Sequence, residues 1–225
     1  QLPAEFINSI SCCEGFEETS FLEAHQTASP TSIRINPFKQ TNLLFALDNH
    51  IPWNDKGFYL NERPNFTYDI LFQAGCYYVQ EAGSMFIEHA LKSCVDFNEM
   101  LLAFDVCASP GGKSTLLNSL LNSESALVAN EIIKQRSEVL AQNLSKWGTC
   151  NVVVTNNDPS SYSEINDVFD IILVDAPCSG SGLFRKQHDA VDEWSIDNVN
   201  LCSQRQKRIL SDIIGTLKQG GTLVY

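Results

Sequence analysis

The sequence predicts an α/β protein in which a Rossmann-like, doubly wound parallel sheet follows a small α+β domain. From about residue 71, short apolar runs alternate with segments of helical periodicity, a pattern typical of parallel sheets with crossover helices. One run, residues 169–174, is almost entirely apolar, as expected for a strand buried on both faces of such a sheet. We therefore expect an N-terminal domain over residues 1–70 and the doubly wound domain over residues 71–225.

The N-terminal domain shows few long periodic segments. A stretch rich in Ser, Thr and Pro at residues 27–32 leads into residues 32–36, where apolar and polar side chains alternate. The alternation predicts a short strand, and Pro37 ends it. Residues 52–57 are expected to form a turn because they combine Pro, Asn, Asp and Gly.

Each element of the second domain follows from a local pattern. Leucines recur at helical spacing between residues 116 and 121, Gly148 stops the next helix, and Gly220 with Gly221 closes the last one. We expect helices over residues 80–95, 112–121, 132–147 and 196–217, and strands over residues 101–106, 126–129, 152–155, 169–174 and 222–225. Right-handed crossovers place the loops after these strands at one edge of the sheet, where such folds bind ligands.

The composition is that of a globular protein with reduced thiols. No stretch is long enough for a membrane helix, and no basic segment followed by an apolar one opens the chain, so we expect a cytoplasmic protein without a membrane partner. Its eight cysteines are scattered along a chain large enough to build a core, which favours free thiols over disulfides. There is no C-x-x-C pair and the four histidines lie far apart, so we expect no metal site.

The net charge of −12 argues against extensive contact with phosphate groups, because nucleic-acid-binding surfaces are usually basic. Basic side chains do cluster at Arg185 and Lys186, and again between residues 205 and 208. A local basic cluster can bind phosphate in a chain whose net charge is negative. The alternative interpretation of Arg185 and Lys186 is a solvated pair on a surface loop.

The first candidate site is the loop between the strand at 101–106 and the helix at 112–121. Its adjacent glycines, Gly111 and Gly112, let the backbone approach a ligand closely, and the free N–H groups of the helix start can bind a carboxylate. The spacing matches neither a P-loop nor the dinucleotide glycine pattern, which Pro110 interrupts, so a nucleotide-dependent oxidoreductase is disfavoured. Lys113 contacts the ligand or, alternatively, faces solvent in the first helical turn. The loop residues expected at a cofactor are Cys107, Ala108, Ser109, Pro110, Gly111, Gly112 and Lys113.

Two acids follow the next two strands of the sheet. Glu131 stands at the end of the second strand, where a carboxylate can accept hydrogen bonds from both ribose hydroxyls, and Asp158 follows the third, where it can bind an adenine amino group. An adenosine with a carboxylate-bearing tail would occupy both acids and the glycine loop, and S-adenosylmethionine fits this description. Taken singly, Glu131 could be a helix-capping acid and Asp158 a loop acid.

The second candidate site follows the strand at 169–174, where Asp175 and Cys178 stand in the run D-A-P-C. Position 5 of cytosine becomes nucleophilic when a thiolate adds to position 6, and a carboxyl group bonded to N3 and the exocyclic amine stabilises the charge that develops. An enzyme that methylates the adenine amino group would need no thiol. A small buried residue in a tight turn is the alternative interpretation of Cys178.

These motifs resemble the Fmu/Sun family of RNA cytosine-C5 methyltransferases, and within it the type that acts on small-subunit ribosomal RNA. Residues 105–113 resemble its D-x-C-A-A-P-G-G-K loop with Ser109 in place of the usual Ala. Residues 34–39 resemble its R-x-N-x-x-K element, and residues 78–85 its Y-x-Q-E-x-x-S-M segment. Glu131, Arg136, Asp158, Asp175 and the pair Arg185 and Lys186 follow in the family's order, so the resemblance covers nearly the whole chain.

The resemblance implies an enzyme that transfers a methyl group from S-adenosylmethionine to C5 of a cytosine in RNA, with 16S ribosomal RNA as the expected partner. It adds Arg136 to the cofactor residues, places Asp175 at both cofactor and base, gives Cys178 a role in product release, and assigns Arg185 and Lys186 to RNA. The family's nucleophile lies in a T-C motif that would follow residue 225, so we expect a truncated, doubly wound methyltransferase sheet and an inactive fragment. A non-catalytic module that binds S-adenosylmethionine and RNA during ribosome assembly is the alternative function.

Overall fold

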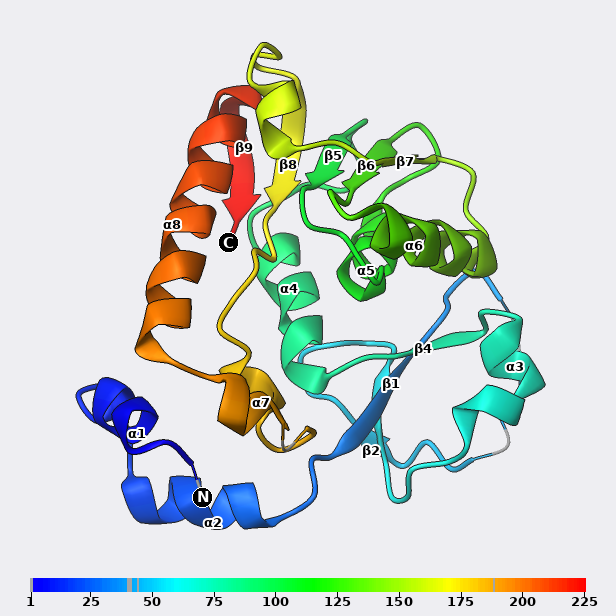
Figure 1. Cartoon of the computed structure of the whole chain (residues 1–225). Coiled ribbons are helices and arrows are strands. Elements are labelled where there is room, and N and C mark those ends of the chain that lie inside the picture. The colour runs from blue at the N-terminus through cyan, green and yellow to red at the C-terminus, as the bar shows by residue number, and fades with distance from the viewer. Residues whose placement is uncertain (1, 40–41, 44, 188) are drawn as a thin grey trace. The chain divides into compact units, whose positions relative to one another are not determined.

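The computed structural model describes residues 2–39, 42–43, 45–187 and 189–225, and its chain forms two compact units (Figure 1). The helical unit comprises Gln1–Pro30 and Pro177–Ile209, and the sheet unit comprises Thr31–Ala176 and Leu210–Tyr225. The domain boundary expected near residue 70 stays a prediction. Within the described ranges, no helix is long and apolar enough to cross a membrane.

The helical unit is built from short helices around an aromatic core. The ring of Phe6 meets those of Phe184 and Trp194 edge-on, with centroids 5.0 and 5.6 Å apart, and Ala190 completes the buried cluster. Such aromatic pairs favour one geometry and so fix how the helices pack. The helices are α1 (Ala4–Ile10), α2 (Glu18–Gln26), α7 (Asp189–Glu193) and most of α8 (Ile196–Ile213), with a 3-10 turn η3 (Ser181–Leu183).

The sheet unit contains the predicted parallel sheet, so the α/β, Rossmann-like fold class is confirmed. Its strands, in the order β7-β6-β5-β8-β9, are all parallel to their neighbours. Strand order reverses between β5 and β8, and ligands of doubly wound sheets bind at that point. The strands are β5 (Leu102–Asp105), β6 (Ala126–Asn130), β7 (Val152–Thr155), β8 (Phe169–Leu173) and β9 (Leu217–Val224).

Helices α4 (Ala82–Lys92), α5 (Gly112–Leu120) and α6 (Lys134–Trp147) accompany this sheet. Leu117 of α5, Leu140 of α6 and Leu127 of β6 are fully buried in one cluster with Ile171 of β8. Burying each such side chain contributes roughly 2 kcal/mol, so the helices are held on the sheet by apolar contact. Two further 3-10 turns, η2 (Pro159–Tyr162) and η4 (Ile214–Thr216), lie in the same unit.

A second, antiparallel sheet lies in the same unit and has the order β2-β3-β1-β4. It confirms the strand expected at residues 32–36, which is β1. The other three strands are too short to show a clear alternation in sequence. The elements are β1 (Thr31–Ile35), β2 (Asn49–His50), β3 (Gly57–Leu60), β4 (Tyr77–Val79), η1 (Phe66–Tyr68) and α3 (Ile70–Gln73).

Several predicted boundaries were wrong. The last helix ends at Ile213, and β9 already begins at Leu217, so Gly220 and Gly221 lie inside a strand and do not close a helix. A register shift between β8 and β9 accommodates Gly220, whose φ is +82°. The expected helix at 80–95 is shorter at both ends, and the one at 132–147 begins later because Ile133 is still extended.

Candidate functional site

The loop after β5 passes into α5 through a backbone turn that requires glycine. Gly111 has a φ of +109° and caps the helix, and its carbonyl accepts the first helical bond from the N–H of Thr115 at 2.8 Å. At Gly112, a Cβ would lie 3.3 Å from a ring carbon of Tyr78, so β4 approaches the loop closely from behind. The first N–H groups of any helix have no partner within the helix, and at such loops they can bind an anionic ligand.

Neighbouring elements brace this loop through backbone contacts. The N–H of Ala108 donates to the carbonyl of Asn130 at 2.8 Å. Ser109 is tied to Arg136 twice, because its hydroxyl donates to the Arg136 carbonyl at 2.9 Å and its own carbonyl accepts from the guanidinium at 3.0 Å. The carbonyl of Pro110 accepts from the Tyr78 hydroxyl at 3.2 Å. The predicted cofactor loop is therefore a fixed part of the sheet unit.

Two ionisable groups beneath the loop have strongly altered pKa values. Burial raises the pKa of Asp105 to about 7, the nearby charge of Asp175 adds to the effect, and a 2.7 Å hydrogen bond from the Ser114 hydroxyl opposes it. Burial also raises the pKa of the Cys107 thiol to about 12, and the charges of Asp105, Glu131 and Asp175 act in the same direction. The charges of the acids that end or follow β5, β6 and β8 therefore all act on one thiol.

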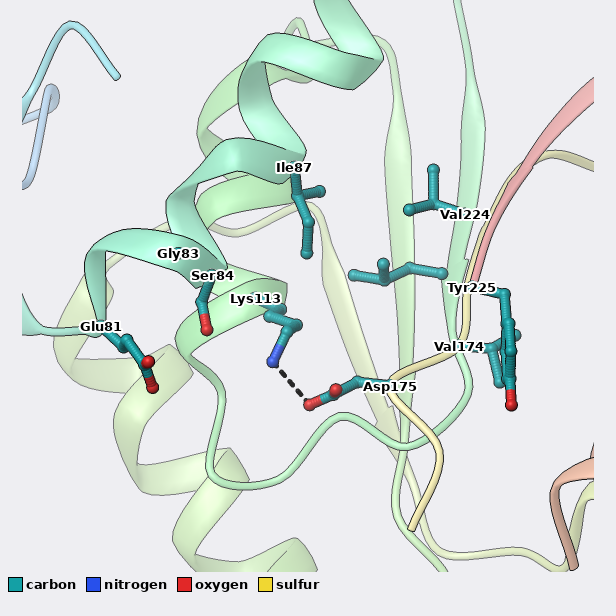
Figure 2. Close-up of a pocket in the computed structure, with 10 residues that line it drawn as sticks. Glu81, Gly83, Ser84, Ile87, Lys113, Val174, Asp175, Val224 and Tyr225 are labelled. Atoms are coloured by element: carbon teal, nitrogen blue, oxygen red, sulfur yellow. Dashed lines mark hydrogen bonds and ion pairs between the residues drawn. The ribbon is translucent and has the colours of Figure 1, made fainter. Parts of the chain in front are cut away.

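A pocket of about 390 Å³ opens between the starts of α4 and α5 and the ends of β8 and β9 (Figure 2). Across it, the Nζ atom of Lys113 lies 2.6 Å from a carboxylate oxygen of Asp175. Glu81 and Ser84 line the side formed by α4, and Tyr225 lines the side formed by β9. The structure thus brings together one predicted residue from each of the two candidate sites.

The two predicted adenosine-binding acids occupy well-defined positions. The side chain of Glu131 is buried, accepts a hydrogen bond from the N–H of Ile133 at 3.0 Å, and lies 3.5 Å from the Arg136 guanidinium. Asp158 caps η2 and accepts bonds from the N–H and hydroxyl of Ser160 at 3.0 and 2.8 Å. Asp158 thus caps a 3-10 turn, whereas Glu131 bonds the N–H of Ile133 without capping α6, and the expected role of both acids toward a ligand stays a prediction.

The remaining predicted residues belong to the helical unit. The Cys178 thiol is exposed, which argues against the alternative of a buried turn residue. The guanidinium of Arg185 donates to the carbonyls of Thr27 and Ala28 at 3.3 and 3.0 Å, so it already has protein partners. Lys186 is exposed. Their proposed contacts with RNA stay predictions.

Sequence reasoning missed one residue that organises the site. The fully buried Asn130 donates to the carbonyls of Val106 and Asn157, and its own oxygen accepts from the hydroxyls of Thr155 and Tyr162. It therefore joins the segments that follow β5, β6 and β7. The available signal was a polar residue at the end of an otherwise apolar strand, directly before Glu131.

Comparisons with known proteins identify the family of this chain. Residues 94–225 match the family model of the 16S rRNA methyltransferase RsmB/F, and residues 2–82 match that of the N-terminal domain of 16S rRNA methyltransferase RsmF. Together the two matches cover most of the chain.

Similar full proteins bear related names. The chain is 36% identical over 209 residues to the ribosomal RNA small subunit methyltransferase F of Aeromonas hydrophila, covering 86% of this chain and 43% of that protein. It is 36% identical over 221 residues to the protein of that name from Escherichia coli K12, covering 91% and 45%. The chain thus spans about half the length of the curated relatives it matches. The structure of a methyltransferase homologue from Pyrococcus horikoshii superposes with a TM-score of 0.73 at 27% identity, over 100% of this chain and 77% of that one.

Proposed function

We propose that this chain, which belongs to the 16S rRNA methyltransferase RsmB/F family, binds S-adenosylmethionine and forms the cofactor-binding part of an RNA cytosine-C5 methyltransferase. The observation that carries the proposal is the Lys113–Asp175 pair, which joins the glycine loop to the D-A-P-C run across one pocket. An rRNA substrate is inferred from the relatives' names, and 16S rRNA is the specific substrate proposed.

Of the predicted cofactor residues, Lys113 and Asp175 line the pocket, and other residues of the loop and of the neighbouring strand ends have groups that fit this cofactor. Gly111 and Gly112 leave room for close approach of a ligand, and the start of α5 supplies N–H donors for a carboxylate. Buried Glu131 has the acceptor oxygens that a ribose diol requires. A polar, partly anionic adenosine derivative is the ligand that this set of donors and acceptors favours.

The chain's own residues divide the work between binding and chemistry. Glu131 and Asp158 hold the ribose and adenine, and the loop at 107–113, fixed by Arg136, holds the amino-acid end. Bound S-adenosylmethionine supplies an electrophilic methyl group. Asp175 binds N3 and the exocyclic amine of the target cytosine, and Lys113 holds this carboxylate in place. Cys178 acts in product release, and Arg185 with Lys186 contacts RNA phosphate.

A non-catalytic module that binds S-adenosylmethionine and RNA is the second candidate function. The family match favours the enzyme. The two functions differ in covalent chemistry. A chain extended to the length of the curated relatives, with Cys178→Ala, should accumulate a covalent adduct with RNA because release is blocked. Absence of the adduct in an RNA-binding, folded variant would favour the binding module.

The cofactor assignment is tested separately by calorimetry on the chain itself. S-adenosylmethionine should bind and NAD should not, because the glycine pattern of a dinucleotide site is absent. Glu131→Gln should weaken binding, since an amide presents only one acceptor oxygen to the ribose hydroxyls. Asp96→Asn, which alters an exposed carboxylate between α4 and β5, serves as the matched control. Folded protein that binds no S-adenosylmethionine would refute the proposal.

A further inference from the structure

Strand β1 has a polar face that is buried rather than solvated. Ser32 and Arg34 of the strand, and Asn36 directly after it, are 4%, 1% and 1% exposed, although their alternation with Ile33 and Ile35 would suggest a surface strand. Buried polar groups are costly unless they are hydrogen-bonded. The hydrogen-bond partners of these side chains therefore identify the elements that pack against this face of the antiparallel sheet.

Arg34 reaches the first turn of α5. Its Nη2 atom donates to the Thr115 hydroxyl at 2.7 Å and to the Gly112 carbonyl at 3.2 Å. Its Nε atom donates to the Gln80 side chain at 2.8 Å, and the guanidinium lies 4.5 Å from the centroid of the Trp147 ring. Burial lowers the pKa of Arg34 to about 9, so the group is still charged at neutral pH and depends on these partners.

The same turn faces the pocket on its other side. Lys113 stands between Gly112 and Thr115 in sequence and projects toward Asp175 (Figure 2). A shift of the turn toward or away from Arg34 would therefore move both the Lys113 ammonium group and the N–H groups of the helix start. The Ser114 hydroxyl holds the turn from the side of the parallel sheet through its 2.7 Å bond to Asp105, and Arg34 holds it from the side of the antiparallel sheet.

We propose that Arg34 is a positioning residue, which sets the first turn of α5, and with it Lys113 and the glycine loop, at the depth that cofactor binding requires. The identity of the ligand rests on the proposed function above. Arg34 itself would touch neither cofactor nor substrate. Its planar fork serves two acceptors on one turn and stacks on Trp147, which a lysine could not reproduce.

Two residues that follow the same strand provide a matched control. Asn36 donates to the Trp147 carbonyl at 2.8 Å, and Lys39 donates to the Lys146 carbonyl at 2.5 Å. Both therefore hold the C-terminal end of α6 instead of the start of α5. Loss of the Lys39 contact should destabilise the unit without moving the cofactor loop.

The experiment compares Arg34→Lys, Thr115→Val and Lys39→Met with the unchanged chain. Affinity for S-adenosylmethionine is measured by calorimetry, thermal unfolding reports stability, and hydrogen exchange reports the amides of residues 112–115. Losing one hydrogen bond to the charged group should raise Kd about tenfold in Arg34→Lys and Thr115→Val. Exchange in the 112–115 amides should accelerate in the same variants. Lys39→Met should alter exchange at residues 146–148 and leave Kd unchanged.

Two results would overturn the inference. One is an unchanged Kd in folded Thr115→Val, which keeps the test valid even where Arg34→Lys does not fold. The other is an equal rise in Kd in Lys39→Met, which would mean that affinity follows stability alone. If the unchanged chain binds no S-adenosylmethionine, the proposed function fails, whereas faster exchange at 112–115 in the Arg34 variant would still support the positioning role.

Discussion

The ammonium nitrogen of Lys113 and a carboxylate oxygen of Asp175 lie 2.6 Å apart, so the start of α5 is joined to the segment after β8 by an ion pair. The two residues follow β5 and β8, strands that are neighbours in the sheet but are separated in sequence by β6 and β7. They meet where strand order reverses, which is where a doubly wound sheet offers room for a ligand.

Replacing Lys113 should affect binding more than stability. The pair is partly exposed, with 23% and 52% of the two side chains accessible, and such pairs contribute about 1 kcal/mol or less to folding. Lys113→Gln should therefore change urea unfolding little while weakening binding of S-adenosylmethionine in calorimetry. Lys92→Gln, which breaks the pairs with Asp55 and Glu88, is the control and should leave the affinity unchanged.

Asp105 should make the protein less stable as pH rises. Its folded pKa of about 7 lies above the ordinary value of 3.8, so the folded state retains a proton that the unfolded state loses between these two values. Stability relative to Asp105→Asn should fall over that interval by a few kcal/mol, at about 1.4 kcal/mol per pKa unit, and level off above pH 7. Urea unfolding at pH 4, 5.5, 7 and 8 measures the difference.

Asp55 provides a control of opposite sign for that experiment. Its hydrogen bond from Lys92 and the charge of that residue lower its pKa, so its stabilising effect is complete above pH 4 and is lost only in stronger acid. The difference between the unchanged chain and Asp55→Asn should be flat from pH 5 to pH 8. A flat profile for Asp105→Asn as well would contradict the buried-acid interpretation.

Cys107 should resist alkylation although it is not fully buried. Its pKa of about 12 leaves almost no thiolate at pH 8, and the thiolate is the reactive form. Brief treatment with iodoacetamide, followed by peptide mass spectrometry, should find the exposed Cys94 and Cys150 modified before Cys107. Equal labelling of the three cysteines in folded protein would show that the surrounding acids do not suppress the thiolate.

Gly75 should tolerate no side chain. Its φ is +68°, and a Cβ would lie only 2.0 Å from the backbone oxygen of Lys146, which cannot move without disturbing α6. Gly220 also has a positive φ, of +82°, but has open space around it. Gly75→Ala should therefore destabilise by well over the roughly 1 kcal/mol expected of Gly220→Ala, as measured by thermal unfolding. Similar losses would contradict this reading of the contact.

The core of the parallel sheet could be predicted from sequence because its strands are apolar runs, and the buried sheet preserves the strand conformation that such runs favour. Strand β9 could not, because Gly220 and Gly221 normally signal the end of a helix, and here a register shift lets a strand pass through them. The glycine loop and Asp175 were each predicted from the sequence as separate sites, because each follows a predicted strand. Their pairing through Lys113 depends on strand order, which spacing alone does not encode.

Arg34 shows most clearly what could not be predicted from the sequence. Its neighbours alternate as on a solvent-exposed strand, and the family-like R-x-N-x-x-K spacing named the residue without giving it a role. Its burial follows from the closeness of β1 to α5 and α6, which are distant in sequence. Polar residues at non-local contacts leave no periodic signature, so only the folded chain reveals them.

The contact between β1 and the two helices also bears on chimeric proteins. Apolar surfaces tolerate many substitutes, but here Arg34 of β1, and Asn36 and Lys39 after it, each bond a particular carbonyl or hydroxyl group on α5 or α6. If the antiparallel sheet of a distant relative replaced this one, those acceptors would lose their donors unless the new segment carried an arginine, an asparagine and a lysine at matching positions. The two sheets can therefore be exchanged between proteins only together.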